Sequence, residues 1–144
     1  MRVFLDANIF FAAVKSSSGG SYYILELAKQ RHFTIVTVAY ALAEAEKNIS
    51  QKIGKDALSR HYENILAVKP VVQSLSTLSE SMKRKLLVSI AEKDVPILAG
   101  ALLAKVEMLV TLDKKDFIAN PKIAKLNLPF KIGTPGDFLQ KYII

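Results

Sequence analysis

Two hydrophobic patterns alternate along the chain. The first consists of short apolar runs rich in β-branched residues, which is the composition of buried parallel strands. These predicted strands are 2–5, 33–38, 71–72, 108–112 and 130–132. The second pattern has apolar residues at helical spacing or many strong helix formers. The predicted helices are 22–30, 40–52, 55–67, 95–105 and one that begins at Thr134. Strands that alternate with helices predict an α/β domain with a parallel sheet covered on both faces.

Individual residues mark several boundaries. Pro96 fits the first turn of one predicted helix, and Pro135 fits the first position of the last one, because proline lacks only an N–H that is unpaired there. Residues 16–20, SSSGG, predict a loop or an interruption of a helix. Residues 79–92 are ambiguous, since SESMKRK is typical of a helix and LLVSI is compatible with a strand. The length and the absence of any linker predict a single domain, 1–144.

Composition narrows the classes of function. Hydrophobic residues make up 51% of the chain, which excludes disorder. The longest apolar stretch, Val95–Ala104, is about half of what a bilayer requires, so we expect no membrane span. The N-terminus does not resemble a signal peptide, and the absence of cysteine excludes disulfides and favours a reducing compartment, so we expect a cytoplasmic protein. The net charge of +7 favours a polyanionic partner such as nucleic acid.

Several acids follow predicted strands or precede helices. Asp6 follows the first strand, Asp113 follows a later one, and Asp116 comes three residues further on. Asp94 precedes a helix, and Glu44 lies in the first turns of another. If the chain reverses direction around the first strand, these acids meet outside the carboxyl ends of the strands, where open α/β sheets bind ligands.

Carboxylates that meet in this way raise one another's pKa unless a cation neutralises them. Oxygen ligands, with no cysteine and no suitably spaced histidine, favour Mg²⁺ or Mn²⁺ over Zn²⁺. Such an ion lowers the pKa of a bound water and stabilises charge on a phosphoryl group, so we expect phosphodiester hydrolysis without a protein nucleophile. Basic residues near the acids are candidates for attracting a phosphate chain. They are Lys83, Arg84, Lys85, Lys93, Lys114, Lys115, Lys122 and Lys125.

Each acid also has an ordinary structural interpretation. Asp94 is placed to cap a helix, which is compatible with metal binding because a helix N-terminus favours an ionised carboxylate. Asp113 and Asp116 are equally compatible with a turn and a cap. Asp6 argues most strongly for a functional role, because a carboxylate between Leu5 and Ile9 is costly to bury without a counter-charge.

Four segments together resemble the PIN-domain family of metal-dependent ribonucleases, which includes the VapC toxins. They are FLDANIF at 4–10, YALAEAEKNI at 40–49, DVPILAGAL at 94–102 and LVTLDKKDF at 109–117. The resemblance implies a three-layer α/β/α sandwich with a central parallel sheet and an acidic pocket that holds Mg²⁺ or Mn²⁺. It also implies cleavage of RNA, a homodimer and, for a chain of this size, a toxin whose antitoxin partner would block the pocket.

The resemblance assigns roles to individual positions. The catalytic acids are Asp6, Glu44, Asp94 and Asp113, and the metal ligands are Asp6, Asp94, Asp113 and Asp116. Asn8 and Thr111 match polar positions that orient the carboxylates, and Lys93, Lys114 and Lys115 are the expected contacts to nucleic acid. The flanking residues select Glu44, whereas helical geometry turns Glu46 to a different face. Leu112 departs from the family, which often has glycine before the acid.

Two other functions use related residues. A non-catalytic nucleic-acid-binding module would keep the fold with an impaired pocket, and the presence of all four acids argues against it. A phosphatase resembling the haloacid dehalogenase family would form an aspartyl-phosphate on Asp6, but Asn8 stands where its general acid is needed. A receiver domain would need a phosphorylatable aspartate on a middle strand, and Val36–Val38 offers none.

Overall fold

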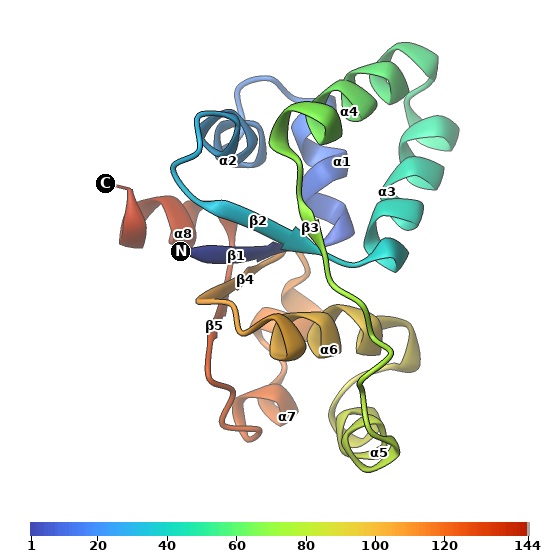
Figure 1. The fold of residues 1–144 in the computed structure, drawn as a ribbon, viewed down its shortest axis with the longest axis vertical. Coiled ribbons are helices and arrows are strands. Elements are labelled where there is room, and N and C mark those ends of the chain that lie inside the picture. The colour runs from blue at the N-terminus through green and yellow to red at the C-terminus, as the bar shows by residue number, and fades with distance from the viewer. Residues whose placement is uncertain (144) are drawn as a thin grey trace.

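The computed structural model describes residues 1–143 and is built on one parallel sheet (Figure 1). Residue 144, the last of the predicted domain, lies outside the described residues. The strands follow the order β3-β2-β1-β4-β5, and every pairing is parallel. They are β1 (Arg2–Leu5), β2 (Thr34–Thr37), β3 (Val71–Val72), β4 (Met108–Val110) and β5 (Lys131–Gly133). The prediction of a parallel sheet is therefore confirmed.

Helices cover both faces of this sheet, which confirms the three-layer sandwich. Figure 1 shows α1 to α4 on one side and α5 to α7 on the other, while α8 packs against α2. The helices are α1 (Ala7–Lys15), α2 (Gly20–Lys29), α3 (Ala39–Lys52), α4 (Lys55–Val68), α5 (Glu80–Ser89), α6 (Val95–Ala104), α7 (Pro121–Ala124) and α8 (Pro135–Tyr142). Two short turns are η1, a 3-10 turn at Glu92–Asp94, and η2, a π-helical turn at Lys114–Ile118. Among residues 1–143, no helix is both long and apolar enough to cross a membrane.

Most of the ambiguous segment at 79–92 forms α5, which ends at Ser89, so the alternative of a strand at LLVSI is wrong. Ser79 caps α5 by accepting a hydrogen bond from the Met82 amide at 3.1 Å. Leu86 is 1% exposed, and α5 packs against α6. Because a helix satisfies its backbone hydrogen bonds internally, this segment does not need to pair with an edge of the sheet.

The strands β1 and β4 lie side by side, and the chain leaves them towards opposite edges of the sheet. From β1 the chain moves to β2 and β3, and it later returns to the other side of β1 to form β4 and β5. Leu5 at the end of β1 pairs with Val110 at the end of β4. A crevice outside the carboxyl ends of two such strands is the usual ligand site of an open α/β sheet.

Helix α6 holds this region together, because it is apolar on all sides and mostly buried. Gly100 lets it approach the sheet closely. A Cβ at this position would overlap the Val38 side chain and lie 3.0 Å from the ring of Phe4. Asp94, immediately before α6, is thereby held at the edge of the crevice.

Candidate metal centre

Asp6 is fixed between the two central strands. Its amide donates to the Val110 carbonyl at 3.1 Å, which extends the pairing of β1 with β4. One carboxylate oxygen, Oδ1, accepts from the Ala7 amide at 2.7 Å, and Oδ2 accepts from the Thr111 hydroxyl at 2.8 Å. The side chain is 8% exposed. Burial raises the pKa of Asp6, against the two hydrogen bonds, and the nearby Glu44 and Asp113 raise it further.

Asn8 and Thr111 connect Asp6 to the turn after β4. The Asn8 amide nitrogen lies 3.3 Å from Asp6 Oδ2 and 3.2 Å from the Thr111 hydroxyl, and the Asn8 oxygen accepts from the Leu112 amide at 3.1 Å. The Thr111 hydroxyl also accepts from the Asp113 amide at 3.1 Å. These bonds place Asn8 and Thr111 where the resemblance expects orienting residues. Leu112 needs no glycine here, since its φ is not positive and its side chain is 44% exposed.

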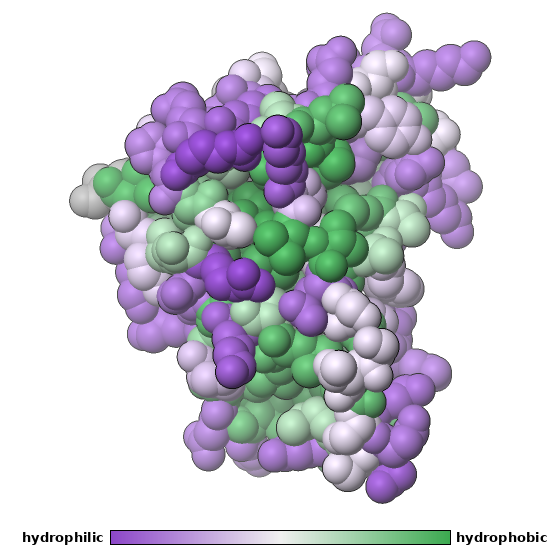
Figure 2. All heavy atoms as spheres, viewed as in Figure 1, coloured by the Kyte–Doolittle hydropathy of each residue, from purple (hydrophilic) through white to green (hydrophobic). Residues whose placement is uncertain are grey.

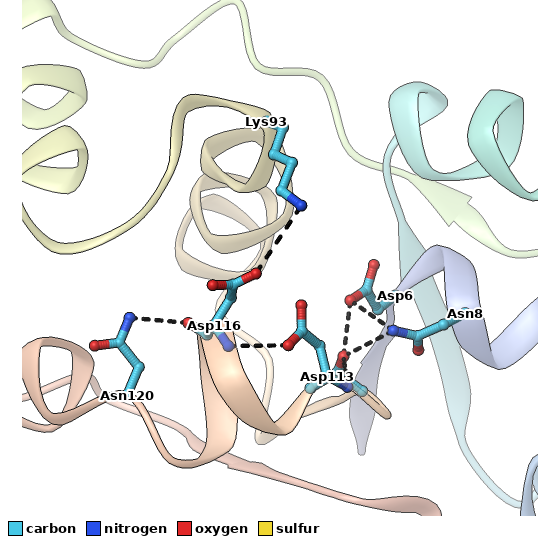
Figure 3. Close-up of polar contacts among 7 residues, drawn as sticks. Asp6, Asn8, Lys93, Asp113, Asp116 and Asn120 are labelled. Carbon is cyan, nitrogen blue, oxygen red and sulfur yellow. Dashed lines mark hydrogen bonds and ion pairs between the residues drawn. The ribbon is translucent and has the colours of Figure 1, made fainter.

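Three other acids converge beside this network. Asp94, Asp113 and Asp116 each offer a carboxylate oxygen, and these atoms lie within 4.8 Å of one another. Figure 3 shows Asp113 between Asp116 and the pair of Asp6 and Asn8. Asp113 Oδ1 accepts from the Asp116 amide at 2.9 Å and so caps η2. A lysine from η1, Lys93, lies 4.0 Å from Asp116 Oδ2. Asp6 is outside this triplet, but its charge contributes to the raised pKa of Asp94, and the charge of Asp113 contributes to the raised pKa of Asp6.

The carboxylate of Asp94 lacks the backbone and hydroxyl donors that fix the carboxylates of Asp6 and Asp113. It occupies the N-cap position of α6 but makes no side-chain cap bond, so the interpretation of Asp94 as a hydrogen-bonding cap is wrong. Its Oδ2 is buried and has no hydrogen-bond partner among the described residues. Burial raises the pKa of Asp94 to about 6, opposed by Lys93 and reinforced by Asp116, Asp113 and Asp6.

Helix α3 forms the opposite wall of a cleft of about 220 Å³. Glu44 lines this cleft together with Asp6, Asp94 and Asp113. Glu46, by contrast, faces the side of α3 that carries interactions with His61 and Tyr62. The structure therefore places Glu44, not Glu46, with the other acids.

Three further residues on the same wall were missed by the sequence analysis. Tyr40, Asn48 and Lys52 line the cleft with Glu44, each four residues from the next. The signal was present in the sequence, because residues spaced by four lie on one helix face. Of the lysines expected to contact nucleic acid, Lys93 lines the cleft, whereas the exposed Lys114 and Lys115 on η2 are not among its lining residues.

The arrangement fits a divalent cation. Every ligand candidate is a carboxylate, the oxygen donor that hard cations such as Mg²⁺ and Mn²⁺ prefer. Burial, reinforced by the neighbouring carboxylates, raises the pKa of Asp6 and Asp94, and Asp94 Oδ2 has no hydrogen-bond partner among the described residues. A cation at this point would neutralise part of the charge of these carboxylates.

The parallel sheet and the acidic cleft outside the carboxyl ends of β1 and β4 define an α/β protein with a candidate metal centre. Comparison with known proteins identifies its family. The family model of the PIN domain matches residues 2–115. The chain belongs to the PIN-domain family.

A solved structure has the same fold. This is the crystal structure of VapBC2 from Rickettsia felis bound to a DNA fragment from their promoter, which aligns with a TM-score of 0.66. The alignment has 22% sequence identity and covers 92% of this chain and 98% of that one. No curated protein matches the chain.

Proposed function

We propose that this protein is an endoribonuclease that depends on Mg²⁺ or Mn²⁺ and hydrolyses RNA phosphodiester bonds. One observation carries the proposal. Acids from four separate segments line one cleft, and the buried Asp94 Oδ2 has no partner among the residues that the structure describes. Membership of the PIN-domain family and the net charge of +7 support it.

In this proposal the chain holds its metal ligands in place before the ion arrives. Asp6 is locked by Thr111 and the Ala7 amide, and Asp113 is locked by the start of η2. Asp94 supplies an oxygen free of hydrogen bonds, and Asp116 adds a fourth carboxylate. When bound, the ion stabilises charge on the phosphoryl group and lowers the pKa of water.

Glu44 faces this group from the other wall of the cleft, and we assign it the role of general base. It accepts a proton from the water that attacks phosphorus, while the P–O ester bond breaks and the leaving oxygen takes up a proton from solvent water. Lys93, at the rim, contacts the phosphate chain, and Lys114 and Lys115 extend the positive charge outside the cleft. The aspartyl-phosphate alternative is disfavoured because Asn8 already donates to Asp6.

A pair of glutamates on α3 provides a matched test. Glu44→Gln should reduce cleavage of a labelled RNA in Mn²⁺ by about 100-fold or more, which is the usual contribution of a general base. Glu46→Gln, two residues away and on another face, should leave cleavage unchanged. Equal effects of the two substitutions would contradict the assignment. RNA binding without any cleavage in Mn²⁺ would instead favour the non-catalytic module.

We also propose that residues 1–144 form one domain that assembles as a homodimer and acts as the toxin of a toxin–antitoxin pair. The fold likeness to VapBC2 supports this assembly. Figure 2 shows apolar residues gathered around β3, where Val71 and Val72 are 39% and 50% exposed and Leu66 is 74% exposed. Light scattering should show a dimer for the wild-type protein and a monomer for the Val72→Glu variant. A wild-type monomer at all concentrations would contradict the dimer.

A further inference from the structure

Four side chains form a ladder along the cleft face of α3. Tyr40, Glu44, Asn48 and Lys52 are spaced by four residues, so successive rungs lie about 6 Å apart along the helix axis. Only Glu44 belongs to the proposed catalytic group. The other three combine an aromatic ring, an amide and an ammonium group, and none of them is a metal ligand in the proposed function.

The chemistry of this ladder matches a nucleotide strand. Tyr40 lines the cleft and is 41% exposed, so its side chain is accessible to a base that enters the cleft. Asn48 offers amide donors and an acceptor, the groups that bind the edge of a base. Lys52 supplies positive charge at the far end of the ladder.

A second aromatic residue, Phe11, lies near two lysine ammonium groups at the Lys52 end of the ladder. Phe11 of α1 also lines the cleft, and the ammonium groups of Lys52 and Lys15 each lie 5.9 Å from the centre of its ring. The ring attracts both cations, so the ammonium group of Lys15, which is not a lining residue of the cleft, lies over the same ring as that of Lys52. The carboxylates therefore have a positive group beyond them on the α3 side, in addition to Lys93 at the η1 side.

We propose that the α3 ladder is a subsite for unpaired nucleotides, in which Tyr40 stacks on a base, Asn48 contacts a base edge, and Lys52 with Lys15 contacts the phosphate chain. The inference rests on the proposed function and deepens it, because it names residues of α3 beyond the acids that would bind the nucleotides beside the cleaved bond. A paired base has both faces covered by its neighbours and cannot stack on Tyr40, whereas an unpaired base can.

The first test separates stacking from the phenol hydroxyl. Its probe is a short fluorescein-labelled single-stranded oligoribonucleotide, and binding is measured by fluorescence anisotropy in the Glu44→Gln background. Tyr40→Leu should weaken binding about 5- to 100-fold, the range for loss of one base–aromatic stack. Tyr40→Phe keeps the ring and should bind as tightly as the parent. Tyr23→Leu, which removes a 48% exposed tyrosine from α2, is the matched control and should have no effect.

The second test uses salt dependence. Lys52→Ala should reduce the slope of log K against log salt by about 0.7, as expected for one lost phosphate contact to a single strand. Lys131→Ala is the control, because Lys131 begins β5 and lies away from the carboxyl ends of the strands. A base-paired duplex of the same sequence should bind more weakly than the single strand and be insensitive to Tyr40→Leu.

The possible results distinguish this inference from the proposed function. If the wild-type protein cleaves RNA but Tyr40→Leu binds it within about twofold of the parent affinity, the subsite is overturned and the proposed nuclease function is not. Equal losses in Tyr40→Phe and Tyr40→Leu also overturn it, because the hydroxyl and not the ring would then be responsible. Absence of both cleavage and RNA binding in the wild-type protein overturns the proposed function and the subsite together.

Discussion

Replacing Asp94 with asparagine should make the metal-free protein more stable while it impairs the metal centre. The substitution keeps the shape of the side chain and removes a charge that is partly buried beside Asp113, Asp116 and Asp6. Burial and these neighbours are the reasons why the pKa of Asp94 is raised from 3.8 to about 6. The charged form is therefore less favourable in the folded protein than in the unfolded chain.

The size of the effect follows from this shift. A rise from 3.8 to about 6 corresponds to about 3 kcal/mol in the free energy of unfolding at neutral pH if it is fully expressed. Because the side chain is partly exposed to solvent, screening reduces this to roughly 1–2 kcal/mol. The penalty is fully present above pH 6 and diminishes as the pH falls from 6 towards 3.8, below which the carboxyl is mostly protonated in both states. The gain from Asp94→Asn should follow the same dependence.

Urea unfolding in EDTA at neutral pH and at about pH 4 measures this gain. Asp56→Asn is a suitable control, because Asp56 lies in the first turn of α4, where negative charge is favourable, and its replacement should give no gain. Added Mn²⁺ should then stabilise the wild-type protein more than Asp94→Asn. The reasoning is refuted if Asp94→Asn destabilises the metal-free protein at neutral pH, or stabilises it equally at both pH values.

Three further predictions concern single side chains. Thr111→Val removes the hydroxyl that donates to Asp6 Oδ2 at 2.8 Å, so we expect Mn²⁺ affinity by calorimetry to fall about 10- to 100-fold, and an unchanged affinity would contradict the orienting role. His61 is 2% exposed, its Nδ1 has no partner in the described part of the chain, and burial lowers its pKa, which the nearby Glu46 opposes. Below about pH 6.5, His61 therefore binds a proton more readily in the unfolded chain than in the folded protein, so the free energy of unfolding should fall as the pH decreases. In urea titrations, His61→Phe should remove this part of the loss of stability. Gly100→Ala should lower the free energy of unfolding by about 1–3 kcal/mol, because the added methyl group overlaps Val38, and full stability would show that α6 can shift.

Most of the fold was readable from local patterns. The β-branched runs at 2–5 and 33–38 formed strands, and Pro135 began the last helix, because composition and proline geometry act within a few residues. The boundaries were less accurate. Val38 became the N-cap of α3 instead of the last residue of β2, and LLVSI became part of α5. In both cases packing against neighbouring elements decided the state of a short apolar run.

The candidate site was only partly readable. Asp6 and Asp113 stood out because each follows a strand, Asp94 and Glu44 stood out because they lie at the starts of helices, and the family resemblance then assigned roles to all four. The ladder of Tyr40, Asn48 and Lys52 was overlooked, because only the tertiary structure shows that this face of α3 lines the cleft.

The sequence by itself determined most of the strands and helices and which acids were available, because those properties depend mainly on neighbours along the chain. Only the tertiary structure decided that these acids share one cleft and that Glu44, not Glu46, faces it. It also decided that Asp94 Oδ2 lacks a partner among the described residues. The reason is physical: burial, hydrogen bonding and repulsion between carboxylates depend on distances through space, and these distances are set by the order of the strands and the packing of α6.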